Sequence, residues 1–302
     1  MLVTLEDGEP GPTGFPHELV TSLPLVVVGI ARGAVDPSWF ELCDVVVDES
    51  DESLAAIEQN LETFPIASVS LALLLRSQPG RPVDEGLVAE SAVYSVLQSG
   101  PEFAAWRAGH PARNEADEGP RVRLERDGST LTVTMTRPDH LNALDARMRD
   151  ELIEGFGLAA ADPDVTVVEL RGEGRGFCAG GDLDEFGSRS DPASAHIIRL
   201  QHSVGRSLSH LPSLTVAYVH GACVGSGIEL AAFADRVVGA MDTHAALPEI
   251  GLGLIPGAGG TVSLTRRIGR LRTAWLAFSG LSIDAGTAYD WGLLDQLEEV
   301  EE

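Results

Sequence analysis

Two glutamates stand 20 positions apart in apolar surroundings, where their carboxyl groups could transfer protons. Glu229 lies in GIELAAFAD, and Glu249 lies in ALPEIGLGLIPGAGG. A carboxyl group among apolar side chains has a raised pKa, which suits general acid–base chemistry near neutral pH. Taken singly, Glu229 also fits a first-turn residue that the helix dipole favours, and Glu249 also fits a capping residue in a loop.

Two runs of small residues could bring bare backbone N–H groups close to a ligand. One is Cys178 to Gly181 within FCAGGDLDEF, and the other is Gly225-Ser226-Gly227. Each run follows a hydrophobic segment and precedes a helix-like one, so we expect both at strand-to-helix junctions, where helix N–H groups lack partners. Two such junctions facing each other would form a two-donor cradle for an oxygen that gains negative charge. Close packing of helix on sheet is the alternative interpretation of either run.

The chain around these residues alternates between strand-like and helix-like segments. Two alternating runs around Asp127-Gly128 predict a hairpin. Either Asp145 or Asn142 could cap the helix that follows the hairpin. The alternation predicts an α/β fold with a largely parallel, buried sheet, whose strand ends are the usual place for a ligand. Further strands are expected at 165–174, 214–221 and 235–240, and helices at 143–160, 197–211 and 225–234.

Other residues of chemical type fit no functional motif. Ser226 is not flanked by the two glycines of a nucleophile elbow. Gly251-Leu252-Gly253 lacks the third glycine of a dinucleotide motif and does not open a βαβ unit. His220 and His244 have no partners at metal-ligand spacing, and the same is true of the three cysteines, Cys43, Cys178 and Cys223. We expect these residues to be structural, and we expect no metal site.

Composition narrows the class of protein. The 302 residues are 44% hydrophobic and 22% charged, as in a soluble globular protein, and no apolar run approaches a membrane span. The N-terminus lacks the basic start of a secretory signal, so we expect a cytoplasmic protein. The net charge of −25 argues against nucleic-acid binding, and all 21 basic residues are arginines. A polyanionic ligand would need an arginine cluster, for which the candidates are Arg121, Arg123 and Arg126, or Arg266, Arg267, Arg270 and Arg272.

Five segments, in order, resemble the crotonase, or enoyl-CoA hydratase/isomerase, superfamily. Each segment is a weak signal alone, but the ordered set is specific, and together the segments span residues 121–295. They are RPDHLNAL (137–144), GEGRGFCAGGDL (172–183), HGACVGSGIELAAFAD (220–235), LPEIGLGLIPGAGGTVSL (247–264) and AFSGLSIDAGTAYDWGLLD (277–295).

The resemblance implies a core of ββα turns arranged as a spiral, assembled as a trimer or as a dimer of trimers. It implies that the N–H groups of Gly181 and Ser226 hold the thioester oxygen of an acyl-CoA substrate. No cofactor is expected, because coenzyme A is part of the substrate. The residues that would line the CoA end are Ala143, Leu144, Ala179, Asp182 and Leu183.

Glu229 and Glu249 fall on the two catalytic glutamates of the family's hydratases, with the same separation. The resemblance therefore implies syn addition of water to a 2-enoyl-CoA, with Glu229 deprotonating the water and Glu249 delivering a proton to Cα. One departure is Ser226, because the centre of this run is commonly glycine in the family. Isomerase, decarboxylase, thioesterase or oxygenase chemistry is open within the same fold. A non-catalytic acyl-CoA-binding subunit is the alternative from another class of protein.

The N-terminal block, residues 1–115, is expected to be mostly helical, and the core is expected at 120–302. The polar, proline-flanked stretch 111–120 fits a linker between them. Residues 42–110 resemble the helical tail that family members carry after the core. We therefore expect this block to cover the active site from the front of the chain, and an unrelated helical domain is the alternative.

Overall fold

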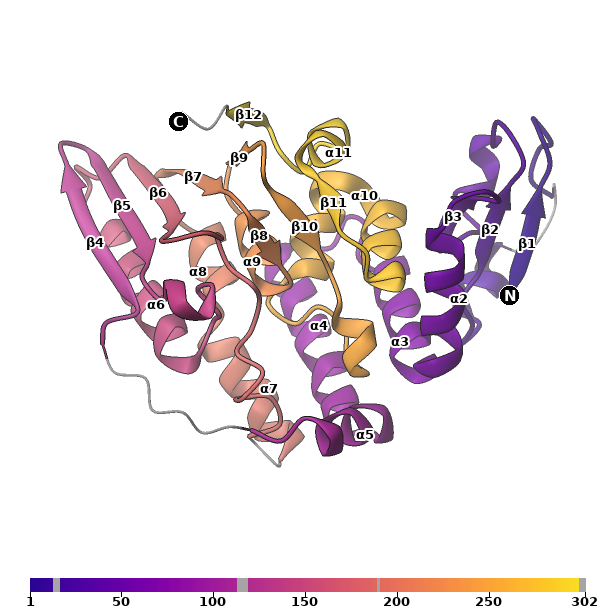
Figure 1. Cartoon of the computed structure of the whole chain (residues 1–302), viewed down its shortest axis with the longest axis horizontal. Helices are drawn as coiled ribbons and strands as arrows, with labels where there is room; N and C mark the ends of the chain where they lie inside the picture. Colours follow the sequence, from indigo (N-terminus) through magenta and orange to yellow (C-terminus); the bar gives the residue numbers. More distant parts are fainter. Residues whose placement is uncertain (13–16, 113–118, 189–190, 299–302) are drawn as a thin grey trace.

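The computed structural model describes residues 1–12, 17–112, 119–188 and 191–298 (Figure 1). A six-stranded sheet lies at one end of the molecule, a three-stranded sheet from the N-terminus lies at the other, and helices fill the space between them. Most of the linker expected at 111–120 falls outside the described residues. None of the helices in the described ranges is long and apolar enough to cross a membrane.

The six-stranded sheet carries the alternation that the sequence predicts. Its strands lie in the order β12-β9-β7-β6-β5-β4, and all neighbours are parallel except β4 and β5. These two strands form the predicted hairpin, in which Asp127 pairs with Thr130 and Gly128 takes a φ of 55°. The strands are β4 (Val122–Asp127), β5 (Thr130–Met135), β6 (Val167–Gly172), β7 (Leu214–Val219), β9 (Arg236–Ala240) and β12 (Gln296–Glu298).

A second, short sheet in the order β11-β10-β8 lies beside the first (Figure 1). Its strands are β8 (Ala222–Val224), β10 (His244–Ala246) and β11 (Ile283–Asp284). The helices of this part of the chain are α6 (Ala146–Ala161), α7 (Pro192–Gln201), α8 (Val204–Ser209), α9 (Ser226–Ala231), α10 (Gly260–Ser279) and α11 (Ala285–Asp290), with short 3-10 helices η2 (Pro138–His140) and η3 (Glu249–Leu252).

Two helix predictions are decided by side-chain capping. Asp145 caps α6, because its carboxylate accepts the N–H of Met148 at 2.7 Å. The single helix predicted at 197–211 is wrong, since the chain breaks into α7 and α8 at His202 and Ser203. The Ser203 hydroxyl accepts the N–H of Arg206 and so starts a new helix.

The N-terminal block contains a small parallel sheet in addition to the predicted helices. Its strands are β1 (Leu2–Leu5), β2 (Val28–Ala31) and β3 (Val45–Asp48), in the order β1-β2-β3. Its helices are α1 (His17–Ser22), η1 (Pro37–Trp39), α2 (Ser53–Thr63), α3 (Pro65–Arg76), α4 (Val83–Gln98) and α5 (Pro101–Gly109).

A buried ion pair fastens this sheet to the helices. The guanidinium of Arg76, at the end of α3, contacts both carboxylate oxygens of Asp44 at 2.7 and 2.8 Å. Arg76 also donates to the carbonyl oxygens of Val20, Leu23 and Leu25, and Asp44 accepts the N–H of Val27. The charges are therefore fully hydrogen-bonded, as burial of an ion pair requires.

The helices of the N-terminal block pack directly against the C-terminal part of the chain. α10 contacts α2, α3 and α4, and α4 also contacts α7. Leu71, Leu75 and Phe103 are buried in one hydrophobic core together with Phe278 and residues of the large sheet. We therefore propose that the N-terminal block folds as one unit with the core and that residues 42–110 serve as the covering tail that the resemblance implies.

A chain that begins at residue 120 is expected to aggregate or to unfold without cooperativity. It would expose the apolar face of α10 that α2, α3 and α4 now cover, and large exposed apolar patches promote association. Gel filtration and thermal denaturation of this fragment, beside the full-length chain, measure the effect. A monodisperse fragment with cooperative unfolding and full activity would show instead that the N-terminal block is an independent unit.

Candidate active site

Three chain segments stop side by side at one place in the fold. Cys178 pairs in parallel with Cys223 of β8, as its N–H donates to the Ala222 carbonyl and its own carbonyl accepts the N–H of Val224. β8 in turn pairs in parallel with β10, and the N–H of Gly225 donates to the Ala246 carbonyl at 2.9 Å. The two small-residue runs and the segment that leads to Glu249 therefore converge.

The first run presents its backbone toward the second. Gly181 bridges to Leu144, whose N–H donates to the Gly180 carbonyl and whose carbonyl accepts the N–H of Asp182. Because peptide groups alternate in direction along an extended chain, the N–H of Gly181 itself points away from Leu144. Gly180 has a φ of 103°, which favours glycine.

The prediction that this run precedes a helix is wrong. Residues 183–187 form a turn, and the next helix in the described residues, α7, begins only at Pro192. The Asp182 carboxylate accepts the N–H of Asp184 at 3.0 Å, and this local hydrogen bond competes with helix formation. Any anion site at Gly181 therefore depends on a bare N–H group and gains nothing from a helix dipole.

The second run does begin a helix. Ser226 is the first residue of α9, and Gly225 before it has a φ of 51°. A side-chain carbon on Gly180 would lie 3.9 Å from the Ser226 nitrogen, and one on Gly181 would lie 3.7 Å from its hydroxyl oxygen. The backbone of Gly180 and Gly181 thus lies beside Ser226, and within the described ranges neither the N–H of Gly181 nor that of Ser226 donates to a protein acceptor.

Glu229 is buried in the first turn of α9, with 1% of its surface exposed. Its Oε2 atom accepts the N–H groups of Ala258 and Gly260, both at 2.8 Å. Burial raises the pKa of Glu229 well above its ordinary value, and the charges of Glu249 and Glu90 raise it further. The two backbone N–H bonds oppose this shift, because they stabilise the ionised form.

Glu249 begins η3 and lies against the second small-residue run. A side-chain carbon on Gly225 would come within 2.5 Å of Glu249 Oε1, and the φ of 51° at this position also favours glycine. Glu249 Oε2 is buried and has no hydrogen-bond partner within the described part of the chain. Burial is the main cause that raises the pKa of Glu249 to about 8. The charge of Glu249 is one of the causes that raise the pKa of Glu229, so the two buried carboxyl groups interact electrostatically.

The residues expected at the CoA end lie around the first run. Asp182 is held by Arg137 at 2.7 Å, and the same Arg137 nitrogen donates to the Ala143 carbonyl. Ala179 is half-buried and Leu183 is exposed, so their side chains can face a ligand. The side chain of Leu144 is 3% exposed, so this residue can contribute only its backbone.

Two residues at the site were not singled out from the sequence for these roles. Asn142 is fully buried with a φ of 54°, and its amide donates to the carbonyls of residues 173, 176 and 177, which fixes the approach to the first run. Glu90 of α4 is 2% exposed and accepts the N–H groups of Gly259 and Thr261. The only sequence signal for Glu90 is a carboxylate on an otherwise apolar helix face, in LVAESAVY.

The two arginine clusters are engaged with the protein itself. In the first, Arg121 pairs with Asp145, Arg123 with Glu125 and Arg126 with Asp162. In the second, Arg267 pairs with Asp295, while Arg266, Arg270 and Arg272 donate to the carbonyls of Arg81, Cys43 and Trp291 respectively. These contacts favour a structural role over binding of a polyanion.

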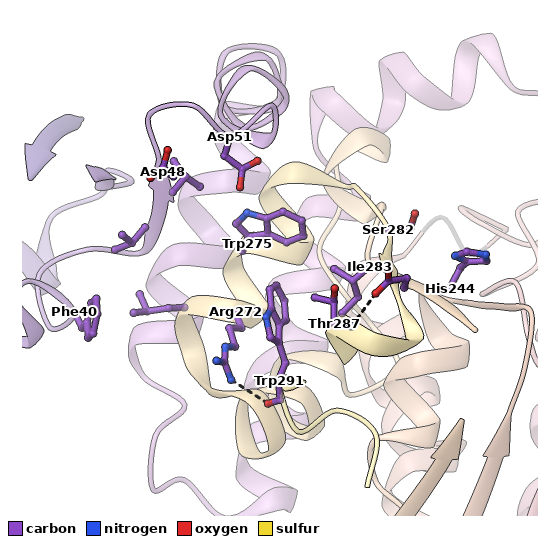
Figure 2. A pocket seen from close by; sticks show the side chains of 14 residues that line it. Phe40, Asp48, Asp51, His244, Arg272, Trp275, Ser282, Ile283, Thr287 and Trp291 are labelled. Atoms are coloured by element: carbon purple, nitrogen blue, oxygen red, sulfur yellow. Dashed lines mark hydrogen bonds between the residues drawn. The ribbon is translucent and has the colours of Figure 1, made fainter. Parts of the chain in front are cut away.

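A cavity of about 820 Å³ lies elsewhere, between β3 and α10 (Figure 2). Trp275 and Trp291 meet edge to face within it, and Arg272 lies over the Trp291 ring. The carboxylates that line it already accept hydrogen bonds from backbone N–H groups. Asp48 accepts the N–H of Ser50, Asp51 that of Ser53 and Asp284 that of Thr287. The cavity shares no lining residue with the two glutamates or the small-residue runs, so it is not the site described above.

Comparison with known proteins identifies the core. The family model described as enoyl-CoA hydratase/isomerase matches residues 125–302. The protein YhaR of Bacillus subtilis (strain 168) is 37% identical over 175 residues, which are 58% of this chain and 68% of that protein. The 1,2-epoxyphenylacetyl-CoA isomerase of Escherichia coli (strain K12) is 34% identical over 57% of this chain and 67% of its own length. The crystal structure of an enoyl-CoA hydratase from Thermoplasma volcanium GSS1 aligns with a TM-score of 0.56 and 32% identity, over 60% of this chain and 72% of that one.

The matched region covers more than half of the 302 residues, so the chain belongs to the enoyl-CoA hydratase/isomerase family. The α/β fold with a crotonase-like core is confirmed, and the protein is a hydratase-like enzyme of acyl-CoA chemistry.

Replacing Glu249 by Gln is expected to stabilise the protein at pH 9 and to leave its stability unchanged near pH 4. The folded state holds a proton on Glu249 up to about pH 8, whereas the unfolded chain releases it near 4.5. The free energy of unfolding of the wild type therefore falls as pH rises through this window, whereas that of the variant does not. At pH 9 we expect the variant to be more stable by about 1–3 kcal/mol. Urea denaturation at both pH values measures it, with the exposed Glu52→Gln as control. A difference that is independent of pH would contradict the raised pKa.

Proposed function

We propose that the protein hydrates 2-enoyl-CoA thioesters to 3-hydroxyacyl-CoA. The observation that supports this proposal is a pair of buried, electrostatically coupled carboxyl groups, of which Glu249 lies against Gly225 in the second small-residue run and Glu229 lies in the first turn of the helix that this run begins. The family's acyl-CoA chemistry supplies the substrate class.

The N–H groups of Gly181 and Ser226 hold the thioester oxygen in this proposal. When water adds to Cβ, electron density moves through Cα to this oxygen, which becomes an enolate-like oxyanion. Two fixed donors in a dry site stabilise that charge without reorganisation, and one donor is worth about 10²–10³ in rate. The Ser226 hydroxyl is not needed for this role.

The hydrogen bonds decide which glutamate carries the proton. Two nearby buried carboxyl groups ionise in succession, so there is a pH range in which the pair shares one proton. Glu229 accepts two backbone N–H bonds, which favour its charge, whereas Glu249 has a buried oxygen with no partner, which favours its neutral form. Glu229 therefore takes a proton from water as the oxygen bonds to Cβ, and Glu249 gives its proton to Cα. Proton exchange between the two carboxyl groups restores the starting state.

Isomerisation is the second candidate, because the relative from Escherichia coli that is named 1,2-epoxyphenylacetyl-CoA isomerase is as similar as the named hydratases. The same pair of N–H groups would serve either reaction. Assay of the purified protein with a panel of 2-enoyl-CoA thioesters, followed by loss of the enoyl absorbance, separates them. No turnover on any of these substrates would remove the hydratase proposal.

Other properties expected from the sequence and from its resemblance stay predictions. They are assembly as a trimer or hexamer, a cytoplasmic location, and action without a cofactor beyond the coenzyme A of the substrate.

Glu249→Gln is expected to lower kcat by about 10²–10⁴ while KM changes by less than about fivefold. The amide keeps the shape of the side chain and cannot donate a proton as an acid does. Glu229→Gln should lower kcat to a similar extent, because an amide cannot accept a proton from water. Steady-state kinetics with Glu52→Gln as the control measure the effect, and near-normal turnover would exclude that glutamate from the mechanism.

Ser226→Pro and Ser226→Ala form a matched pair that isolates the backbone donor. Ser226 is the first residue of α9, where proline is tolerated, so the proline variant loses the N–H and keeps the helix. We expect kcat/KM to fall about 10²–10³ for Ser226→Pro and less than about threefold for Ser226→Ala. If Ser226→Ala lost activity as Ser226→Pro does, the hydroxyl and not the N–H would be the required group.

A further inference from the structure

Four successive N–H groups, of residues 258–261, are shared between two carboxylates from distant parts of the sequence. Glu229 accepts the first and the third at 2.8 Å. Glu90 of α4 accepts the second, from Gly259, at 2.7 Å and the fourth, from Thr261, at 2.9 Å. The Thr261 hydroxyl also donates to Glu90, at 2.7 Å. The N–H groups at the start of a helix need such partners, and here Glu90 supplies half of them.

No side chain separates the two carboxylates from this turn. A side-chain carbon on Gly260 would lie 2.6 Å from Glu229 Cγ, and one on Gly257 would overlap the ring of Tyr94, one helical turn after Glu90. The turn therefore lies directly between α4 and α9. If Glu90 moves, the N–H groups of Gly259 and Thr261 move with it. The N–H groups bound to Glu229 belong to the neighbouring residues of the same turn, so they shift as well.

We propose that Glu90 is a positioning residue for the reaction, because it holds the turn that orients Glu229 and places a third carboxylate beside the catalytic pair. This inference rests on the roles proposed above for Glu229 and Glu249. It makes the N-terminal block a contributor to the chemistry as well as a cover for the core.

The charges around Glu90 give the proposal a measurable consequence. Glu229 and Glu249 face Glu90 from α9 and η3, Arg199 faces it from α7, and Tyr94 lies on the same helix, with the Arg199 guanidinium 4.3 Å from its ring centre. Burial is the main cause that raises the pKa of Glu90 to about 7, against its hydrogen bonds and Arg199. The Glu90 charge in turn raises the pKa of both Glu229 and Glu249. Removal of that charge lowers both values.

The test compares Glu90→Gln with two controls in the full-length chain. Glu90→Gln is expected to lower kcat about tenfold and to leave KM within about threefold of the wild-type value. We also expect the alkaline limb of the pH–rate profile to shift to lower pH by about half a pH unit or more. Gln78→Leu removes an uncharged contact to the same Thr261 hydroxyl, and Glu85→Gln removes an exposed charge from the same helix. Both control variants should show the alkaline limb of the pH–rate profile at the same pH as the wild type. If Glu90→Gln lowers kcat but leaves the limb unmoved, its role is structural and the proposal is overturned.

A readout that needs no turnover separates this proposal from the hydratase proposal. The Cδ signals of ¹³C-labelled glutamate, assigned with Glu229→Gln and Glu249→Gln, report the two titrations directly, and calorimetry with butyryl-CoA reports substrate-site integrity. Lower titration midpoints in Glu90→Gln support the proposal even if no enoyl-CoA is hydrated, and unshifted midpoints overturn it. If Glu90→Gln does not fold, Glu90→Asp replaces it, because aspartate keeps the negative charge but moves the carboxylate back by one methylene group. For Glu90→Asp, a lowered kcat with an unchanged alkaline limb of the pH–rate profile supports the proposal. A wild-type kcat in Glu90→Asp overturns it.

Discussion

The candidate site depends on one backbone constraint, the parallel alignment of three segments that end at the same level. Cys178 pairs with Cys223, and β8 pairs with β10, so the chain after each segment turns away at a common edge. At that edge the backbone is nearly free of side chains, which leaves N–H groups available and lets carboxylates come close. The positions of Gly181, Ser226 and Glu249 follow from this alignment.

The same alignment requires the protein to bury acidic groups, which is unfavourable unless donors meet them. Glu229 and Glu90 meet four N–H groups at the start of α10, where the helix dipole also favours negative charge. Glu249 has no such partner for one buried oxygen, so it holds a proton instead of a charge. In the proposed mechanism, this difference in hydrogen bonding assigns the role of acid to Glu249 and the role of base to Glu229.

Local signals in the sequence predicted much of the fold and supplied the residues of the candidate site. Alternating β-branched residues around Asp127-Gly128 determine the hairpin, and the glycine before Ser226 starts α9 with Glu229 on its buried side. The turn after Gly181 was predicted as helix, because the Asp182 hydrogen bond that stops a helix cannot be seen in a pattern of acidic residues. Glu90 could not be placed at all, since its partner at Gly259 lies 169 residues away in the chain.

That long separation determines when the site can be complete. The N–H groups of Gly259 and Thr261 are buried, and a buried donor without a partner costs about 1–3 kcal/mol. Before the N-terminal helices dock, water must solvate these groups, and the turn that binds Glu229 has no second carboxylate to hold it. Docking of α4 replaces that water with Glu90 and covers Gly257 with Tyr94 in the same step. The carboxylate pair therefore reaches its dry, ordered state only when the first third of the chain packs onto the last, so stability and catalytic geometry depend on the same contact.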